Sequence, residues 1–306
     1  MRLCRIKTPA GPRIAYYEER GILPLEEAAR HEGQNPGWAQ GSCILEYLPG
    51  GPHYELAREL SGSTAPRLQG VEILVPVSNP KKIFLLAGNY ADHIKEGGGM
   101  AVERAETFPY VFMKPPSTTL NDPGKPVIIP SVSPGAIDWE LELGVVIGKK
   151  AKYVKEAEAL SHVAGYTIIN DISNRKFHPN PGRKKREKDG FFDWLHGKWF
   201  DNFCPMGPCV ADTGAIPDPQ NLRLELKLNG ETRQGSNTSK MIFSVAQLIE
   251  FISTMVTLEP GDIISTGTPS GVGNTTGTYL KPGDQMQGAI ERIGTLTTLM
   301  AAEGGK

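Results

Sequence analysis

The alternation of apolar and polar residues predicts a chain built mainly from β-strands. Asp138–Gly148 alternates strictly, with bulky apolar side chains on one face and two glutamates on the other. Leu222–Leu228 has a leucine at every second position and leads into Asn229-Gly230, the strongest short signal for a hairpin turn. Ile83–Ala87 and Gly165–Ile172 are short apolar runs, which are typical of buried strands.

Helical spacing of apolar residues occurs in fewer places. Ser244–Met255 has apolar residues at helical spacing, which predicts an amphipathic helix, and Lys155–His162 also has a helical pattern. A further short strand is expected over Asp262–Thr266. The 35 glycines and 25 prolines favour many turns and short strands over a helical bundle. These features predict a β-rich fold of the α+β class.

The first 76 residues lack the density of carboxylates, histidines or glycine-rich turns that chemistry requires. Leu3–Ile6 and Arg13–Tyr17 are expected to be short strands, and Leu25–Arg30 a short helix. A chain of 306 residues is typical of about two domains. We therefore predict a small N-terminal accessory domain, residues 1–76, followed by a catalytic domain, residues 77–306.

Charge and hydropathy exclude several classes of protein. The 33 lysines and arginines are balanced by 34 aspartates and glutamates, whereas a dedicated nucleic-acid binder needs a cationic excess. We find no secretory signal and no apolar run of about 20 residues. The four cysteines are too few for a disulfide framework, and Cys204 and Cys209 are expected to be small buried apolar residues. We therefore expect a cytoplasmic protein with no nucleic-acid or membrane partner.

Three acidic residues form the first candidate site. Glu140 and Glu142 lie on one face of a predicted strand, about 6.5–7 Å apart, so their charges repel unless something neutralises them. One interpretation is a solvent-exposed face, since many surface strands alternate acidic with aliphatic residues. The other is a buried cluster with Asp171, which ends the next predicted strand. Such hard oxygen ligands suit Mg²⁺, Mn²⁺ or Ca²⁺ and do not suit zinc.

A histidine and a glutamate follow another predicted strand. If Asn89–Glu96 forms a helical turn, His93 and Glu96 lie at positions i and i+3 on one face. A carboxylate beside an imidazole fixes its tautomer and raises its basicity, which is the arrangement of a general base. The alternative is an ordinary surface pair on a helix.

Two further features are candidates for contacting a substrate. Lys198 lies among Trp199 and Phe200, where it either serves the site or packs its aliphatic stem along the aromatic rings. Ser265–Gly273 is dense in small residues and can present backbone N–H groups to an anion. That loop lacks the pattern of a P-loop or a dinucleotide-binding loop, so nucleotide binding is not predicted.

Eight motifs follow one another between Lys82 and Met300. They are Gly88-Asn-Tyr-Ala-Asp-His93, Phe112-Met-Lys-Pro-Pro, Asp138-Trp-Glu-Leu-Glu-Leu-Gly-Val-Val-Ile-Gly148, Gly165-Tyr-Thr-Ile-Ile-Asn-Asp-Ile-Ser173, Gly197-Lys-x-Phe-Asp, Asn229-Gly-Glu-x-x-Gln, Asn237-Thr-Ser-Lys-Met-Ile-Phe243 and Thr266-Gly-Thr-Pro-Ser-Gly-Val-Gly273. In this order they resemble the fumarylacetoacetate hydrolase superfamily. The resemblance implies a mixed β-sandwich roll, a homodimer, and a divalent metal, Mg²⁺ or Mn²⁺, in the site.

The resemblance also implies roles for individual residues. The family's metal ligands correspond to Glu140, Glu142 and Asp171. Its water-activating histidine and glutamate correspond to His93 and Glu96, and its active-site lysine corresponds to Lys198. Contacts with the substrate are expected from four residues: Tyr90, Arg175, His178 and Thr268.

The segment after Asp171 departs from the family pattern. Where the family usually has Ala-Arg-Asp-x-Gln, this chain has Asn174-Arg-Lys-Phe-His178. The changed positions often meet the substrate, which indicates a substrate different from those of the best-known members. A stretch rich in lysine and arginine follows, up to Lys188. It is either a nucleic-acid patch or a mobile lid over 176–189 that attracts an anionic substrate, and the neutral net charge favours the lid.

These features together predict a divalent-metal-dependent hydrolase. It would cleave a C–C bond in a 2,4-dioxo acid of the acylpyruvate or fumarylpyruvate type through a metal-bound enolate. The predicted partner is a small anionic 2-oxo acid. The alternative within the family is an isomerase or decarboxylase of a 2-oxo diacid, such as 2-hydroxyhepta-2,4-diene-1,7-dioate isomerase or oxaloacetate decarboxylase. A non-catalytic binding protein with a degenerate site is the alternative from another class, and the intact ligand set disfavours it.

Overall fold

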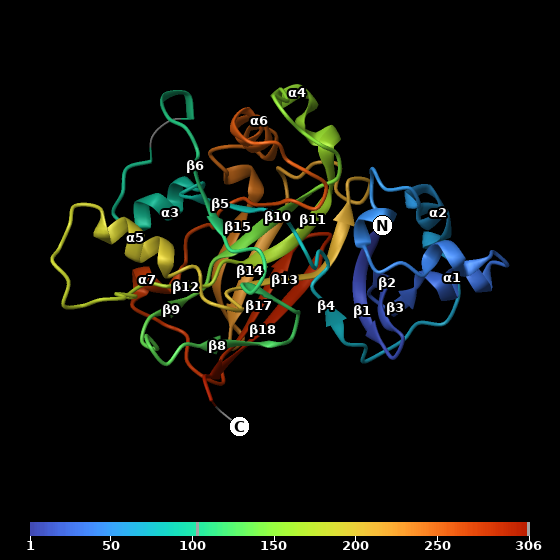
Figure 1. The fold of residues 1–306 in the computed structure, drawn as a ribbon, viewed down its shortest axis with the longest axis horizontal. Helices are drawn as coiled ribbons and strands as arrows, with labels where there is room; N and C mark the ends of the chain where they lie inside the picture. Colours follow the sequence, from blue (N-terminus) through green and yellow to red (C-terminus); the bar gives the residue numbers. More distant parts are fainter. Residues whose placement is uncertain (102–103, 305–306) are drawn as a thin grey trace.

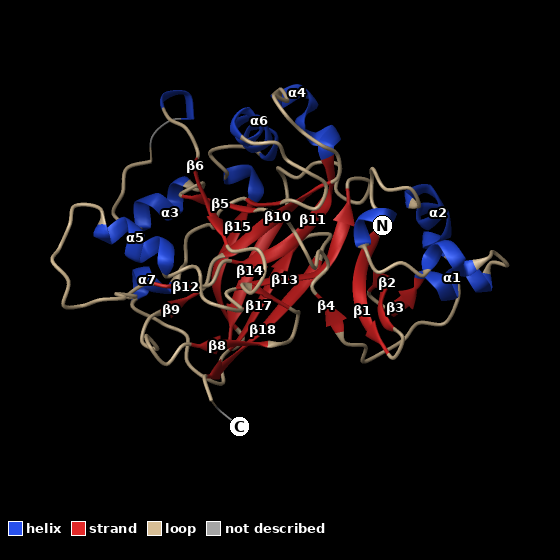
Figure 2. Cartoon of the chain, viewed as in Figure 1, coloured by secondary structure: helices blue, strands red, loops and turns tan. Residues whose placement is uncertain are grey.

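A computed structural model describes residues 1–101 and 104–304, in which strands fill the centre and helices lie around them (Figures 1 and 2). The larger of two main sheets has eleven strands, nine of them in the order β3-β2-β1-β13-β11-β10-β16-β5-β6, with β4 beside β1 and β7 beside β13. These strands are β1 (Arg2–Thr8), β2 (Gly11–Glu18), β3 (Gly21–Pro24), β4 (Ile73–Leu74), β5 (Ile83–Ala87), β6 (Tyr110–Lys114), β7 (Leu120–Asn121), β10 (Leu141–Ile147), β11 (Val163–Asn170), β13 (Cys204–Asp212) and β16 (Ile263–Ser265).

The second main sheet has five strands in the order β15-β14-β17-β18-β8. They are β8 (Pro126–Ile129), β14 (Arg223–Leu228), β15 (Glu231–Asn237), β17 (Gln285–Ile290) and β18 (Gly294–Ala302). The predicted hairpin joins β14 to β15. Both of its turn residues, Asn229 and Gly230, have positive φ angles of 51° and 87°, as a tight two-residue hairpin requires. This sheet packs on the larger one, since a Cβ atom at Gly288 would lie only 2.6 Å from Leu141 Cδ1.

Seven α-helices surround the sheets in the described part of the chain. They are α1 (Leu25–His31), α2 (Tyr54–Glu59), α3 (Ala91–Glu96), α4 (Glu156–Ala159), α5 (Asp189–His196), α6 (Val245–Met255) and α7 (Gly273–Thr276). The predicted helix over 244–255 forms as α6 and begins at a capping box, in which Ser244 and Gln247 each bond the other's backbone N–H. Helices α3, α5 and α7 gather on the side of the molecule away from the N-terminal segment (Figure 1). None of the helices described is long and apolar enough to cross a membrane.

The N-terminal segment joins the larger sheet through its first strand. Strand β1 pairs antiparallel with β13, with Leu3 opposite Val210. Side chains of this segment also share an apolar cluster with residues of β5 and β10, such as Leu85 and Val146. The segment predicted as an accessory domain therefore shares both a sheet and a core with the rest of the chain, and the boundary at residue 76 stays a prediction.

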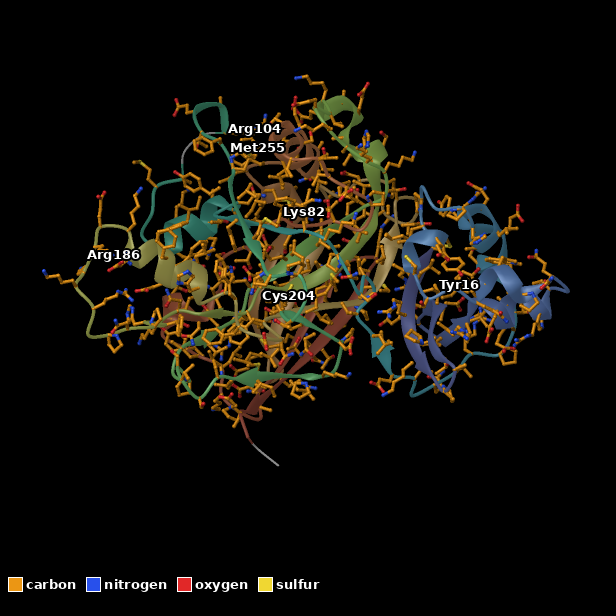
Figure 3. The ribbon with its side chains drawn as sticks, viewed as in Figure 1. Tyr16, Lys82, Arg104, Arg186, Cys204 and Met255 are labelled. Carbon is orange, nitrogen blue, oxygen red and sulfur yellow. The ribbon has the colours of Figure 1, made fainter. Side chains whose placement is uncertain are left out.

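The centre of the larger sheet is buried on both faces. Every residue of β10, β11 and β13 is buried, including Cys204, which Figure 3 labels near the middle of the molecule, and Cys209. The two cysteines are thus the small buried residues that the sequence predicts. The alternation in 138–148 does not reflect a solvent-exposed face, because every residue of β10 is buried and Glu140, which precedes it, is buried too. Of the two interpretations of Glu140 and Glu142, the exposed one is wrong.

Candidate active site

Three carboxylates meet where strands β10 and β11 lie side by side. Glu140 immediately precedes β10, Glu142 lies within it, and Asp171 immediately follows β11. The two strands are antiparallel, and the Asp171 N–H donates to the backbone oxygen of Glu140 at 2.9 Å. One oxygen from each of the three carboxylates lies within 4.8 Å of the others, and all three residues are buried. The structure therefore brings together the acidic cluster that the sequence predicts.

The surroundings of Glu142 show whether the cluster fits a metal ion. Its Oε2 accepts hydrogen bonds from Ser265 Oγ at 2.5 Å and from the Gly267 N–H at 2.9 Å. Its Oε1 is buried and has no hydrogen-bond partner among the described residues. Burial, followed by the charges of Asp171 and Glu140, raises the pKa of Glu142 well above its usual range. A buried carboxylate oxygen without a donor needs a proton or a cation, so this donor set fits a divalent metal that prefers hard oxygen ligands.

Two buried lysines flank Asp171. Lys198 Nζ lies 2.6 Å from Asp171 Oδ2 and 3.0 Å from Glu140 Oε2, while Lys114 Nζ lies 2.7 Å from Asp171 Oδ1. Burial alone would lower the pKa of Lys198, but Asp171 and Glu140 outweigh it and raise the value, so this lysine stays charged. For Lys114 burial prevails and lowers the pKa. The sequence assigned no role to Lys114, although this residue lies in the motif Phe112-Met-Lys-Pro-Pro.

The predicted histidine–glutamate pair forms on α3. His93 Nδ1 lies 2.9 Å from Glu96 Oε1, and Glu96 Oε2 accepts a hydrogen bond of 2.9 Å from the Gly271 N–H. Burial raises the pKa of Glu140, but Lys198, Arg175 and then His93 outweigh it and hold that pKa below its usual value. His93 therefore lies within electrostatic reach of the carboxylate cluster.

Arg175 joins the cluster to Asp138, a residue that the sequence placed on the face of Glu140 without a role. Arg175 Nε donates to Asp138 Oδ2 at 2.8 Å, and its Nη2 donates to Glu140 Oε1 at 2.5 Å. Burial alone would lower the pKa of Arg175, but Glu140 and Asp138 outweigh it and raise the value. The predicted contact of Arg175 with substrate stays a prediction, since both ends of its guanidinium already bind carboxylates.

The other predicted substrate contacts have unequal support. The Tyr90 hydroxyl is buried and has no hydrogen-bond partner within residues 1–101 and 104–304. Thr268 Oγ1 donates to the Leu141 backbone oxygen at 3.0 Å and accepts from Gln234 Nε2 at 2.8 Å, so its hydroxyl proton anchors the loop. His178 is 62% exposed and lies 2.7 Å from Asp193 on α5. The contacts of all three with a substrate stay predictions.

The predicted lid segment is attached to α5 by ion pairs. Arg183 contacts Asp189 and Asp193, and Arg186 contacts Asp189. Figure 3 shows Arg186 at the outer edge of this segment, where its side chain is 79% exposed. Beyond the segment, Trp194 packs against Phe112, and both rings lie within 5.4 Å of Lys198 Nζ. Helix α5 therefore connects the exposed basic segment to the buried lysine of the site.

Comparison with known proteins agrees with this geometry. The family model described as the fumarylacetoacetate (FAA) hydrolase C-terminal domain matches residues 82–300. The chain belongs to the fumarylacetoacetate hydrolase family. This finding confirms the family and the strand-rich mixed fold that the sequence predicts.

Three relatives illustrate the range of this family. The mitochondrial oxaloacetate tautomerase FAHD2A of Bos taurus is 41% identical over 97% of this chain and 90% of its own length. The 2,4-didehydro-3-deoxy-L-rhamnonate hydrolase of a Sphingomonas strain is 43% identical over 72% of this chain and 73% of its own length. A maleylpyruvate hydrolase from Sphingobium, solved with manganese(II) and pyruvate, has a TM-score of 0.72 and 26% identity, with 99% of each chain covered. Fumarylacetoacetate hydrolase relatives of this chain are thus enzymes of more than one reaction type, and one of them binds a divalent metal.

Proposed function

We propose that this enzyme hydrolyses a C–C bond in a small 2,4-dioxo acid of the acylpyruvate or fumarylpyruvate type. The observation that carries the proposal is the His93–Glu96 pair within electrostatic reach of the three buried carboxylates. A hydrolase needs both a cation site that binds the 2-oxo acid and a base that activates water. The hydrolase relatives from Sphingomonas and Sphingobium support the same reaction type.

The carboxylates supply the binding half of this chemistry. Glu140, Glu142 and Asp171 are the residues that would hold Mg²⁺ or Mn²⁺, and the ion would polarise the oxygens of a 2-oxo acid as a Lewis acid. Lys198, which remains charged, lies against two of these carboxylates. Its ammonium group would stabilise the negative charge that develops on the substrate during C–C cleavage.

The helix α3 supplies the proton-transfer half. Because a carboxylate only accepts hydrogen bonds, Glu96 fixes the proton of His93 on Nδ1 and leaves the Nε2 lone pair free. Glu96 is itself held by the Gly271 N–H, so the imidazole keeps its orientation. His93 Nε2 would take a proton from the attacking water. The Tyr90 hydroxyl at the start of the same helix would bind the substrate.

A second candidate is keto–enol tautomerisation of a 2-oxo diacid such as oxaloacetate. The Bos taurus relative, which matches nearly the whole chain, favours it. Tautomerisation needs a base close to an enolisable carbon but no positioned water. His93 serves both reactions, so the substrate decides between them.

A single assay separates the two candidates. Purified protein with Mg²⁺ or Mn²⁺ is mixed with acetylpyruvate, fumarylpyruvate or oxaloacetate, while enol absorbance and released pyruvate are followed. Hydrolysis consumes the enol of a 2,4-dioxo acid and releases one pyruvate per substrate. Tautomerisation changes the enol absorbance of oxaloacetate without releasing pyruvate. Enol loss with oxaloacetate alone, without release of pyruvate, would replace the hydrolase proposal by the tautomerase.

A further inference from the structure

Asp138 has more partners than any of the three carboxylates in the cluster, although it does not belong to the cluster. It is fully buried. Its Oδ1 accepts hydrogen bonds from the backbone N–H groups of Trp139 at 2.8 Å and Gly273 at 2.6 Å. Its Oδ2 accepts from the Asn274 N–H at 3.0 Å and from Arg175 Nε at 2.8 Å. One carboxylate thus joins three segments that are far apart in the sequence.

The turn over 271–274 leads from Asp138 to the histidine–glutamate pair. The Gly271 N–H donates to Glu96, while the Gly271 backbone oxygen accepts from Trp139 Nε1 at 3.1 Å. Two residues farther on, the N–H groups of Gly273 and Asn274 donate to Asp138. The turn is therefore bound by Glu96 at one end and by Asp138 at the other.

The same carboxylate also leads to the metal-binding cluster. Arg175 bridges Asp138 and Glu140, so the position of its guanidinium depends on both acids. Arg175 donates a hydrogen bond to Glu140 Oε1, and Lys198 donates one to Glu140 Oε2. Without the charge of Asp138, Arg175 would be attracted to Glu140 alone.

The turn packs closely against Asp138 at Gly273. A Cβ atom at Gly273 would lie 2.7 Å from Asp138 Oδ1 and 2.0 Å from the backbone oxygen of Thr278. Only glycine therefore lets the backbone approach the carboxylate this closely.

We propose that Asp138 is a positioning residue that couples the carboxylate cluster to the His93–Glu96 pair. One branch runs through Arg175 to Glu140, and the other runs through the turn over 271–274 to Glu96. The inference rests on the proposed function only for its effect on hydrolysis. The geometry of the two branches does not depend on which substrate is used.

The test compares Asp138→Asn with a matched control, Asp262→Asn. Asp262 is also fully buried, accepts from the N–H groups of Lys82 and Glu259 at 3.1 and 2.7 Å, and pairs with Lys82 Nζ at 2.8 Å. It immediately precedes β16, at the end opposite Ser265, and the hydrogen-bond and ion-pair partners of its carboxylate among the described residues are Lys82 and Glu259. Both variants lose one charge and one acceptor at a buried turn, so both are expected to unfold at a lower temperature.

Only Asp138→Asn should change the site. Mn²⁺ affinity measured by calorimetry should fall about 10- to 100-fold, the usual effect of removing a group that orients a metal ligand. Amide hydrogen exchange in α3 and at Gly271 should become faster in this variant. Asp262→Asn should retain wild-type Mn²⁺ affinity and wild-type exchange in α3.

Equal Mn²⁺ affinity and α3 exchange in wild type and Asp138→Asn would overturn the coupling, as would equal changes in the two variants. A wild type that binds no Mn²⁺ would overturn it too, since the centre to be positioned would not exist. Neither measurement needs a substrate. The coupling through Asp138 can therefore be confirmed or refuted whether or not the protein proves to be a hydrolase. If hydrolysis is observed, Asp138→Asn combined with Glu96→Gln should cost less kcat than the product of the two single losses.

Discussion

The carboxylate centre and the basic segment over 176–189 lie on either side of α5 and are stabilised in different ways. The centre consists of buried acids on central strands, each held by backbone groups or buried lysines. The basic segment is mostly exposed, and in its ion pair between Arg186 and Asp189 the arginine side chain is 79% exposed. One region is fixed by the sheet, and the other lies on the surface, where contacts such as Phe177 with Phe200 and Arg183 with Asp193 attach it.

The difference shows which side chains are held in fixed positions, as chemistry requires, and which are not. The side chains of the centre are held in this way, and those of the basic segment are not. Breaking one partner of a buried ion pair such as Lys198–Asp171 costs about 3–5 kcal/mol, because a charge is left unpaired in a low-dielectric site. Exposed ion pairs are screened by water and salt and are readily broken. The centre is therefore suited to hold a metal and a base, while the basic segment is free to respond to an anionic ligand.

Removing the base should have the largest effect on the centre. His93→Ala is expected to lower kcat for hydrolysis about 10²- to 10⁴-fold, the usual contribution of a general base. Mn²⁺ affinity should stay unchanged, because His93 is not among the carboxylate ligands. The control is His31→Ala, which removes a histidine paired with Glu32 at 3.1 Å on the surface. Equal activity in the two variants would contradict the role of His93.

Removing one ligand should have the next largest effect. Glu142→Gln deletes the carboxylate whose Oε1 has no donor in the described part of the chain, so Mn²⁺ affinity is expected to fall more than about 100-fold, beyond the range for groups that only orient a ligand. Calorimetric titration checks this. The matched control is Glu225→Gln on β14, whose side chain is 44% exposed, and it should bind Mn²⁺ like wild type. Unchanged affinity in Glu142→Gln would remove this residue from the ligand set.

The same substitution should stabilise the metal-free protein at neutral pH. Burial and the neighbouring acids raise the pKa of Glu142, so the folded chain keeps this proton to a higher pH than the unfolded chain does. Its contribution to stability therefore falls as pH rises above the unfolded pKa of about 4.3. In Glu142→Gln the side chain does not ionise, so it makes no pH-dependent contribution to stability. With chelator present, its unfolding temperature should match wild type near pH 4 and exceed it at pH 7, and a gap that shrinks with rising pH would refute the argument.

The smallest effect is expected in the basic segment, where ligand binding should change how readily a protease reaches the backbone. Trypsin has several cleavage points over 183–188, and cutting there should be fast in metal-free protein. Metal plus oxalate should slow it, because the bound anion attracts the lysines and arginines toward the site. Cleavage after the exposed Arg58 on α2 serves as an internal reference. Equal rates at 183–188 in both states would mean that the segment is no lid.

Local sequence determined most of the elements and the identity of the acidic cluster. Alternation over 138–148 and the run over 165–172 locate two strands whose ends bear Glu140, Glu142 and Asp171, because side-chain direction in a strand repeats every two residues. The spacing of His93 and Glu96 likewise requires only one helical turn. The sequence could not tell whether Glu140 and Glu142 face solvent, since burial depends on what packs against the strand.

Tertiary structure decided how the site is supported. Lys114 reaches Asp171 across 57 positions of sequence, and Gly273 reaches Asp138 across 135. The pairing of β1 with β13 likewise places Leu3 opposite Val210, and it merges the N-terminal segment into the larger sheet. Such contacts depend on which strands become neighbours and in what register, and no periodicity within a single segment encodes either. The charges that hold Asp171 and the turn that holds Glu96 were therefore fixed only when the sheets assembled.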